Sequence, residues 1–103
     1  MKTNDRFFSL LGLARRANRI SCGHGAALSS VLKGRASLVL ITEDASERLK
    51  REFSRAASGK NIEVAVLDCT MNDIAYAVGM KAGVLTVNDG GFSEKIMSLC
   101  SAD

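Results

Sequence analysis

The feature that most constrains the fold of this chain is the regular alternation of helical and extended patterns along its 103 residues. Apolar residues at helical spacing predict helices, and β-prone apolar runs predict strands between them. The order α-β-α-β-α-β-α-β-α predicts an α/β fold in which helices cover both faces of a sheet of about four strands. The predicted helices span residues 4–18, 26–33, 46–58, 71–78 and 92–100, and the predicted strands span 20–22, 37–41, 62–67 and 84–87.

Polar residues at fixed spacing predict how two of these helices begin. The motifs Asp44-x-x-Glu47 and Thr70-x-x-Asp73 each predict a capping pair at a helix N-terminus. The helix over residues 46–58 also carries opposite charges four positions apart, which predict ion pairs on an ordinary solvated face. These pairs are Glu47 with Arg51 and Arg48 with Glu52.

Length and composition indicate a single globular domain over residues 1–103. Apolar residues make up 47% of the sequence and charged residues 24%, which is typical of a soluble domain with one core. No apolar run approaches the roughly 18 residues that cross a bilayer, and the N-terminus lacks a signal peptide's apolar segment, so we expect a cytoplasmic protein without a membrane partner. The three cysteines have no zinc-site spacing, so we expect free thiols and no metal: Cys22, Cys69 and Cys100.

Positive charge is concentrated in the first half of the chain. Residues 1–55 contain eleven Lys and Arg against five Asp and Glu, whereas residues 56–103 contain three against six. The net charges are therefore +6 and −3. A lopsided field of this kind suits a phosphate-binding surface, although helix faces solvated by Lys and Arg would give the same count.

The segment Gly23-His24-Gly25 is a glycine-rich turn between a predicted strand and a predicted helix. The N–H groups at such a helix N-terminus favour anions. With Glu43 twenty residues after Gly23, the turn also resembles a dinucleotide-binding motif, but Leu28 stands where that motif needs a small residue. A nucleophilic pair of Cys22 and His24 has no third group to orient the imidazole. We therefore expect no catalytic residue and no cofactor.

Several motifs, taken in order along nearly the whole chain, resemble one known family. These are Leu10–Ala17, the glycines at 23 and 34 followed by Ala36-x-Leu38-Val39, Glu43–Ser46, Asn61–Val64 and Ile74–Gly79. Their order and spacing are similar to those of the kink-turn-binding ribosomal proteins of the seven-Ae and thirty-e types, in particular a small bacterial ribosomal-protein-like branch. The resemblance implies a three-layer α/β/α sandwich with a small mixed sheet. It also implies binding of sharply bent RNA through the turn before the second helix and nearby loops.

The chain departs from that family at the base-reading positions. Where the family has an Asn and a Glu that contact sheared G·A pairs and a Lys near the backbone, this sequence has Gly25, Ala26 and Ser29. The resemblance and the charge pattern together give a set of candidate RNA-binding residues. The set is Arg15, Arg19, Gly23, His24, Gly25, Ala26, Ser29, Lys33, Glu43, Asp44, Cys69, Thr70 and Ile74.

The function expected from these observations is RNA binding without catalysis. The expected partner is structured RNA, either ribosomal RNA or RNA containing a kink-turn, with weakened or altered specificity, in contact with the ribosome or the transcription and translation machinery; no DNA partner is expected. We also expect one continuous positive patch from Arg15 and Arg19 to the Gly23 turn. The alternative is a protein-interaction module that kept the fold and lost RNA recognition, and that uses an apolar rim of Ile41, Leu67, Met71 and Ile74.

Overall fold

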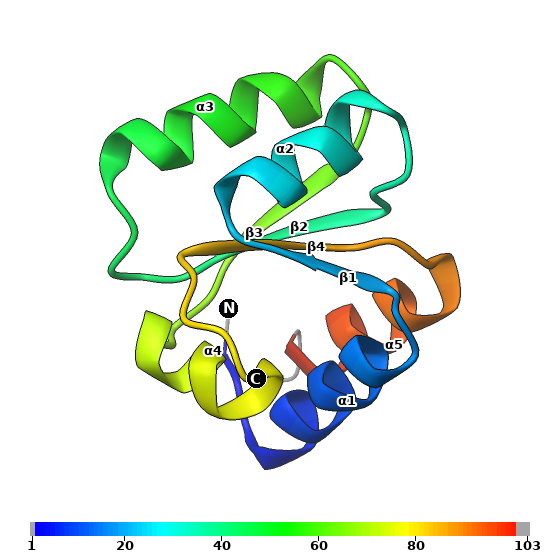
Figure 1. The fold of residues 1–103 in the computed structure, drawn as a ribbon, viewed down its shortest axis with the longest axis vertical. Helices are drawn as coiled ribbons and strands as arrows, with labels where there is room; N and C mark the ends of the chain where they lie inside the picture. The colour runs from blue at the N-terminus through cyan, green and yellow to red at the C-terminus, as the bar shows by residue number, and fades with distance from the viewer. Residues whose placement is uncertain (1, 101–103) are drawn as a thin grey trace.

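The computed structural model describes residues 2–100 and contains the predicted alternation of helices and strands (Figure 1). The prediction of an α/β fold is confirmed, with most element bounds within two residues of those expected. The elements are α1 (Asp5–Arg16), β1 (Ile20–Cys22), α2 (His24–Leu32), β2 (Leu38–Ile41), α3 (Glu47–Ser58), β3 (Glu63–Val66), α4 (Met71–Val78), β4 (Val84–Val87) and α5 (Gly90–Cys100).

The four strands form one mixed sheet in the order β1-β4-β2-β3. Strand β4 pairs antiparallel with both β1 and β2, and β3 pairs parallel with β2. All four residues of β2 and of β4 are buried, because these two strands lie in the middle of the sheet with helices on both sides. The apolar run at residues 37–41 therefore predicted a central strand correctly.

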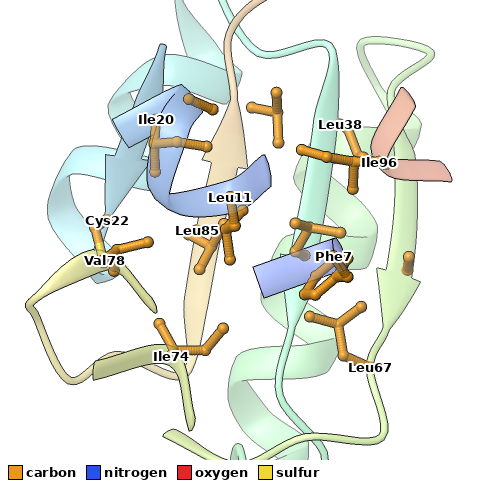
Figure 2. Packing of buried hydrophobic residues seen from close by; sticks show 14 of the residues in the cluster. Phe7, Leu11, Ile20, Cys22, Leu38, Leu67, Ile74, Val78, Leu85 and Ile96 are labelled. Carbon is orange, nitrogen blue, oxygen red and sulfur yellow. The ribbon is translucent and has the colours of Figure 1, made fainter. Parts of the chain in front are cut away.

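Helices cover both faces of the sheet and enclose one apolar core on each face. Helices α1, α4 and α5 lie on one face, and α2 and α3 lie on the other (Figure 1). Phe7, Leu11 and Ile74 belong to the first core, which Figure 2 shows at close range. Phe53 and Val31 are buried in the second. This arrangement is the expected three-layer α/β/α sandwich.

The observed helix caps agree with the sequence at α1 and α4 and differ from it at α3. The carboxamide of Asn4 accepts a hydrogen bond from the N–H of Phe7, and Thr70 and Asp73 form the predicted capping box. At α3 the prediction of an Asp44 cap is wrong, because the hydroxyl of Ser46 accepts the bond from the N–H of Leu49. The carboxylate of Asp44 can therefore accept a hydrogen bond from another segment of the chain.

Helices α2 and α5 each begin two residues earlier than predicted, because their glycines occupy the first helical turn. The backbone of Gly23 has φ of +94°, a conformation in which other residues are strained, and the helix starts directly after it at His24. At α5, the carboxylate of Asp89 accepts from the N–H of Phe92, so helix formation starts at Gly90. Gly25 and Gly90 therefore lie inside helices and not in turns.

Helices α1 and α4 are in close contact at Gly12. A Cβ atom added there would lie 2.9 Å from the backbone carbonyl oxygen of Ala77, so one helix would have to move. We expect Gly12→Ala to destabilise the fold by about 1 to 3 kcal/mol, the usual cost of overpacking, as measured by urea unfolding. Gly25→Ala is the matched control, because nothing lies within 4 Å of its Cβ position, and its stability should equal or exceed the wild-type value.

Candidate nucleic-acid interface

Four segments that are distant in sequence meet at one edge of the molecule, on the left of Figure 1. We call residues 22–26, 42–46, 67–71 and 80–84 the loop edge. The N–H of Gly23 donates to the carbonyl of Val84, and the N–H of Glu43 donates to the carbonyl of Cys69, both at 3.0 Å. The loop before α3, the loop before α4 and the turn before α2 are thus held in one surface.

The first turn of α2 presents its N–H groups at this edge. Its N-cap is Gly23, which has no side chain to accept from these donors, and the next three residues, His24, Gly25 and Ala26, are exposed. The first N–H groups of a helix lack partners within the helix and carry its positive dipole end. This turn is therefore an open set of donors for an anion or for a carbonyl group of a ligand.

The side chain of Asp44 links two of the loops. Its carboxylate accepts a hydrogen bond from the N–H of Met71 at 3.1 Å, at the first residue of α4. A hydrogen bond from the Thr42 side chain, followed by that from Met71 and the charge of Lys81, holds the pKa of Asp44 below its usual value. The carboxylate is therefore ionised at neutral pH and fixes the relative positions of the loops before α3 and α4.

The loop edge is acidic around Cys69. Burial, together with the nearby carboxylates of Asp73, Asp68, Glu43 and Asp44, raises the pKa of this thiol to about 12. Phosphate groups would be repelled from this end of the loop edge, whereas amino groups of bases could donate to the carboxylates.

Positive charge approaches the loop edge at its other end. Burial raises the pKa of the Cys22 thiol, and the guanidinium of Arg15 lies near enough to lower it in part. Arg15 of α1, near Cys22, and Lys81, near Asp44, are thus two cations close to segments of the loop edge. The loop edge thus combines an anion-accepting end with an acidic end.

The single histidine, His24, connects α2 to α3. Its Nε2 atom lies 2.8 Å from a carboxylate oxygen of Glu52, and its ring packs edge-on against Phe53 with ring centres 5.6 Å apart. Cys22 is buried in the core on the opposite face of the sheet, so the two residues form no nucleophilic pair. The raised pKa of Cys22 keeps its thiol protonated and unreactive at neutral pH.

The two ion pairs predicted on α3 are absent from the part of the chain that the structure describes. Glu52 bonds to His24, and Glu47 pairs with Lys50 at 3.7 Å. Both predictions were wrong because spacing along one helix ignores partners on the neighbouring helix and the alternative three-residue spacing.

The structure brings only some of the predicted site residues together. Gly23, His24, Gly25, Ala26, Glu43, Asp44, Cys69 and Thr70 lie on the loop edge. Arg19 and Lys33 lie at the opposite edge, since Arg19 precedes β1 and Lys33 follows α2. Arg19 is within 4.0 Å of Asp89. The length of β1 therefore separates Arg19 from the Gly23 turn, and the expected positive patch joining Arg15, Arg19 and this turn stays a prediction.

Two of the predicted residues cannot contact a ligand through their side chains. Cys69 is 2% exposed and Ile74 is fully buried in the core under α4 (Figure 2). The hydroxyl of Thr70 accepts from the N–H of Asp73, so it is already engaged in the helix cap. Ser29 is half-buried one turn along α2 from Gly25, at the margin of the loop edge.

The proposed apolar rim for a protein partner is also mostly interior. Ile41, Leu67 and Ile74 are each at most 1% exposed, and Met71 alone of the four is partly accessible. These residues pack in the cores beneath the loops, because strand ends and the inner face of α4 point toward the sheet. Apart from the partly accessible Met71, they therefore provide no exposed apolar surface.

Sequence reasoning missed the segment after α4. Met80 is 45% exposed, and its methyl carbon would lie 3.5 Å from a Cβ atom at Gly23. Gly83 lies against Ala45 and Met71, which brings this segment beside the loops before α3 and α4. The available signal was Gly79, whose left-handed φ of +79° ends α4 and turns the chain back toward the sheet.

With the fold and this edge described, the chain can be compared with known proteins. A sequence profile of the Ribosomal protein L7Ae/L30e/S12e/Gadd45 family matches residues 5–97. The chain belongs to this family. The matched residues include every strand and nearly all of α5, so the similarity to the L7Ae family extends over almost the entire described fold.

Two relatives from the same family carry the name RNA-binding protein YlxQ. The protein of Bacillus subtilis (strain 168) is 31% identical over 94 residues, which cover 90% of this chain and 93% of the relative. The protein of Enterococcus faecium is 26% identical over 95 residues, which cover 92% of this chain and 91% of the relative.

Solved structures show the same fold. A protein of unknown function from Bacillus halodurans C superposes with a TM-score of 0.88 at 29% identity, covering 96% of this chain and all of that chain. The Giardia lamblia 15.5kD RNA binding protein superposes with a TM-score of 0.74 at 19% identity, covering 95% of this chain and 88% of the other. The similarity to the Giardia lamblia protein concerns the fold alone.

The L7Ae-type topology differs from that of a dinucleotide-binding domain. The glycine turn follows β1, which pairs antiparallel with β4, whereas the dinucleotide motif lies at the crevice of adjacent parallel strands. No cluster of three or more potential metal-ligating side chains occurs within residues 2–100. None of the helices in the same range is long and apolar enough to cross a bilayer.

Proposed function

We propose that this chain binds structured RNA at the loop edge and catalyses no reaction. The observation that carries the proposal is the convergence of the open N-terminus of α2 with the loops before α3 and α4 on one exposed edge. Family membership and relatives named as RNA-binding proteins support RNA as the ligand. The protein is proposed to act as a single cytoplasmic domain at the ribosome or the transcription and translation machinery.

The two ends of the loop edge are suited to different parts of an RNA. The N–H groups of the first turn of α2, with Arg15 and Lys81 nearby, can hold phosphate oxygens. The carboxylates of Glu43 and Asp44 can accept hydrogen bonds from the amino groups of unpaired or non-canonically paired bases. We infer that the RNA backbone lies over α2 and that bases face the acidic loops.

Kink-turn specificity is proposed to be weaker than in the ribosomal proteins that the sequence resembles. The side chains at Gly25 and Ala26 supply no hydrogen-bonding group, and Ser29 supplies a short hydroxyl where a lysine is expected. Each missing base-reading group removes about 1 to 3 kcal/mol of discrimination. The chain would then bind bent RNA through contacts to the RNA backbone more than through contacts to the RNA bases.

The proposal is tested by titrating labelled RNAs with the purified protein at low salt. The RNAs are a kink-turn stem, a ribosomal RNA fragment and a tRNA. We expect at least one to bind, with an affinity that falls steeply with added salt. Charge reversal at the cations near Cys22 and Asp44, Arg15→Glu with Lys81→Glu, should weaken binding at least about tenfold, since each substitution replaces attraction to phosphate by repulsion.

Lys60→Glu with Lys95→Glu is the matched control for charge, because it changes the net charge by the same amount and both lysines are exposed outside the four segments of the loop edge. This variant should bind as the wild type does. The proposal is rejected if none of the three RNAs binds at low salt, or if Lys60→Glu with Lys95→Glu weakens binding as much as Arg15→Glu with Lys81→Glu.

A further inference from the structure

Outside the loop edge, helix α3 carries three exposed arginines on one side. Arg48, Arg51 and Arg55 are three and four positions apart, so they lie on a single face of the helix. Together with Glu52 and Ala56 they line a shallow groove of about 630 Å³ along α3. We call these three residues the arginine row.

The charge of the arginine row is not neutralised by neighbouring side chains. The two acidic residues of α3 are already engaged, since Glu47 pairs with Lys50 and Glu52 bonds to His24. Within residues 2–100, no carboxylate lies within 4.0 Å of a guanidinium of the row. Three like charges on one face repel each other unless a ligand compensates them.

The arginine row is continuous with the loop edge. Arg48 also lines a smaller groove with His24 and Ser46, where the first turns of α2 and α3 meet. From Arg48 the row extends seven residues along α3, or about 10 Å. Over that distance one strand of a nucleic-acid duplex carries about three phosphates.

We propose that the arginine row binds the phosphate backbone of the same RNA, in the stretch that flanks the part held at the loop edge. This inference rests on the proposed function and adds a second contact surface to it. Guanidinium groups bind phosphate oxygens through two parallel hydrogen bonds, and their row begins where the open donors of α2 end. An acidic protein surface would also complement the charge of the arginine row. It would not account for the position of the row next to the proposed RNA site at the loop edge.

The test measures how RNA affinity depends on salt. The variant Arg51→Ala with Arg55→Ala is titrated with the RNA that the wild type binds most tightly, at several salt concentrations between about 50 and 200 mM. Affinity falls as salt is added, and each lost phosphate contact should reduce the magnitude of the slope of log affinity against log salt concentration by about 0.7 to 0.9. For two lost contacts we therefore expect the magnitude of the slope to fall by about 1.4 to 1.8, together with weaker binding at low salt.

Two further variants separate phosphate contact from changes of net charge or folding. Arg51→Lys with Arg55→Lys keeps the charge and should retain most of the wild-type slope. Lys60→Ala with Lys95→Ala removes the same charge from two exposed residues outside the row and should leave the slope unchanged. Circular dichroism of each variant checks that α3 remains folded.

The outcomes distinguish this inference from the proposed function. A wild-type slope in the alanine variant, with RNA still bound, overturns the role of the arginine row and leaves RNA binding at the loop edge intact. The role of the arginine row is also overturned if Lys60→Ala with Lys95→Ala reduces the slope as much as Arg51→Ala with Arg55→Ala does. Failure of the wild type to bind any RNA rejects the proposed function itself and this inference with it.

Discussion

Restoring the three absent side chains on α2 should raise affinity for a kink-turn RNA by about 30-fold or more. The variant carries Gly25→Asn, Ala26→Glu and Ser29→Lys, the residue types that the resembling ribosomal proteins have at these positions. Two regained base contacts at about 1 to 3 kcal/mol each give at least about 2 kcal/mol, which corresponds to roughly 30-fold. Filter binding or fluorescence anisotropy at fixed salt measures the change.

The structure can accept the new side chains at positions 25 and 26. Gly25 and Ala26 are exposed, and nothing lies within 4 Å of a Cβ atom at Gly25. A glutamate in the first turn of α2 also interacts favourably with the helix dipole, so folding should not be impaired. The gain should disappear with an RNA whose sheared G·A pairs are replaced by Watson–Crick pairs. An equal gain with both RNAs, or no gain with either, would show that α2 does not face the bases.

The sequence was sufficient to predict the order and type of the elements because apolar periodicity reflects burial directly. Residues 38–41 of the apolar run are buried and form a central strand, and Thr70 and Asp73 are near enough in sequence to form their capping box. These features depend on local chemistry. The start of α2 was placed two residues late because a glycine can mark a turn or occupy a first helical turn equally well.

The site was less predictable because its composition depends on the direction in which each element runs. Arg19 and Lys33 are close in sequence to Gly23, yet β1 carries the chain about 10 Å from Arg19 to Gly23, and α2 carries it about 13 Å back again. Both residues therefore lie at the far edge. The partner of Glu52 likewise depended on the neighbouring helix, because its carboxylate bonds to His24 and not to an arginine of the row.

Truncation of Phe53 to alanine should be the most destabilising of the single substitutions considered, at about 3 to 5 kcal/mol. Phe53 is fully buried on the inner side of α3, in the core that it shares with Val31 of α2. A domain of this size has a total stability of about 5 to 15 kcal/mol, so the variant should unfold at a much lower urea concentration. The midpoint of urea unfolding, followed by circular dichroism, measures the loss.

The same substitution connects the core to the binding edge, because the ring of Phe53 supports the imidazole of His24 at the start of α2. At temperatures where Phe53→Ala remains folded, we expect weaker RNA binding than in the wild type, since the first turn of α2 loses its packing against α3. Phe8→Ala is the matched control: Phe8 is half-buried on the opposite face of the sheet and should cost less stability without affecting RNA affinity. If Phe53→Ala retained wild-type affinity while folded, the open turn of α2 would be ordered by its attachment to the sheet alone, through the bond from the N–H of Gly23 to Val84.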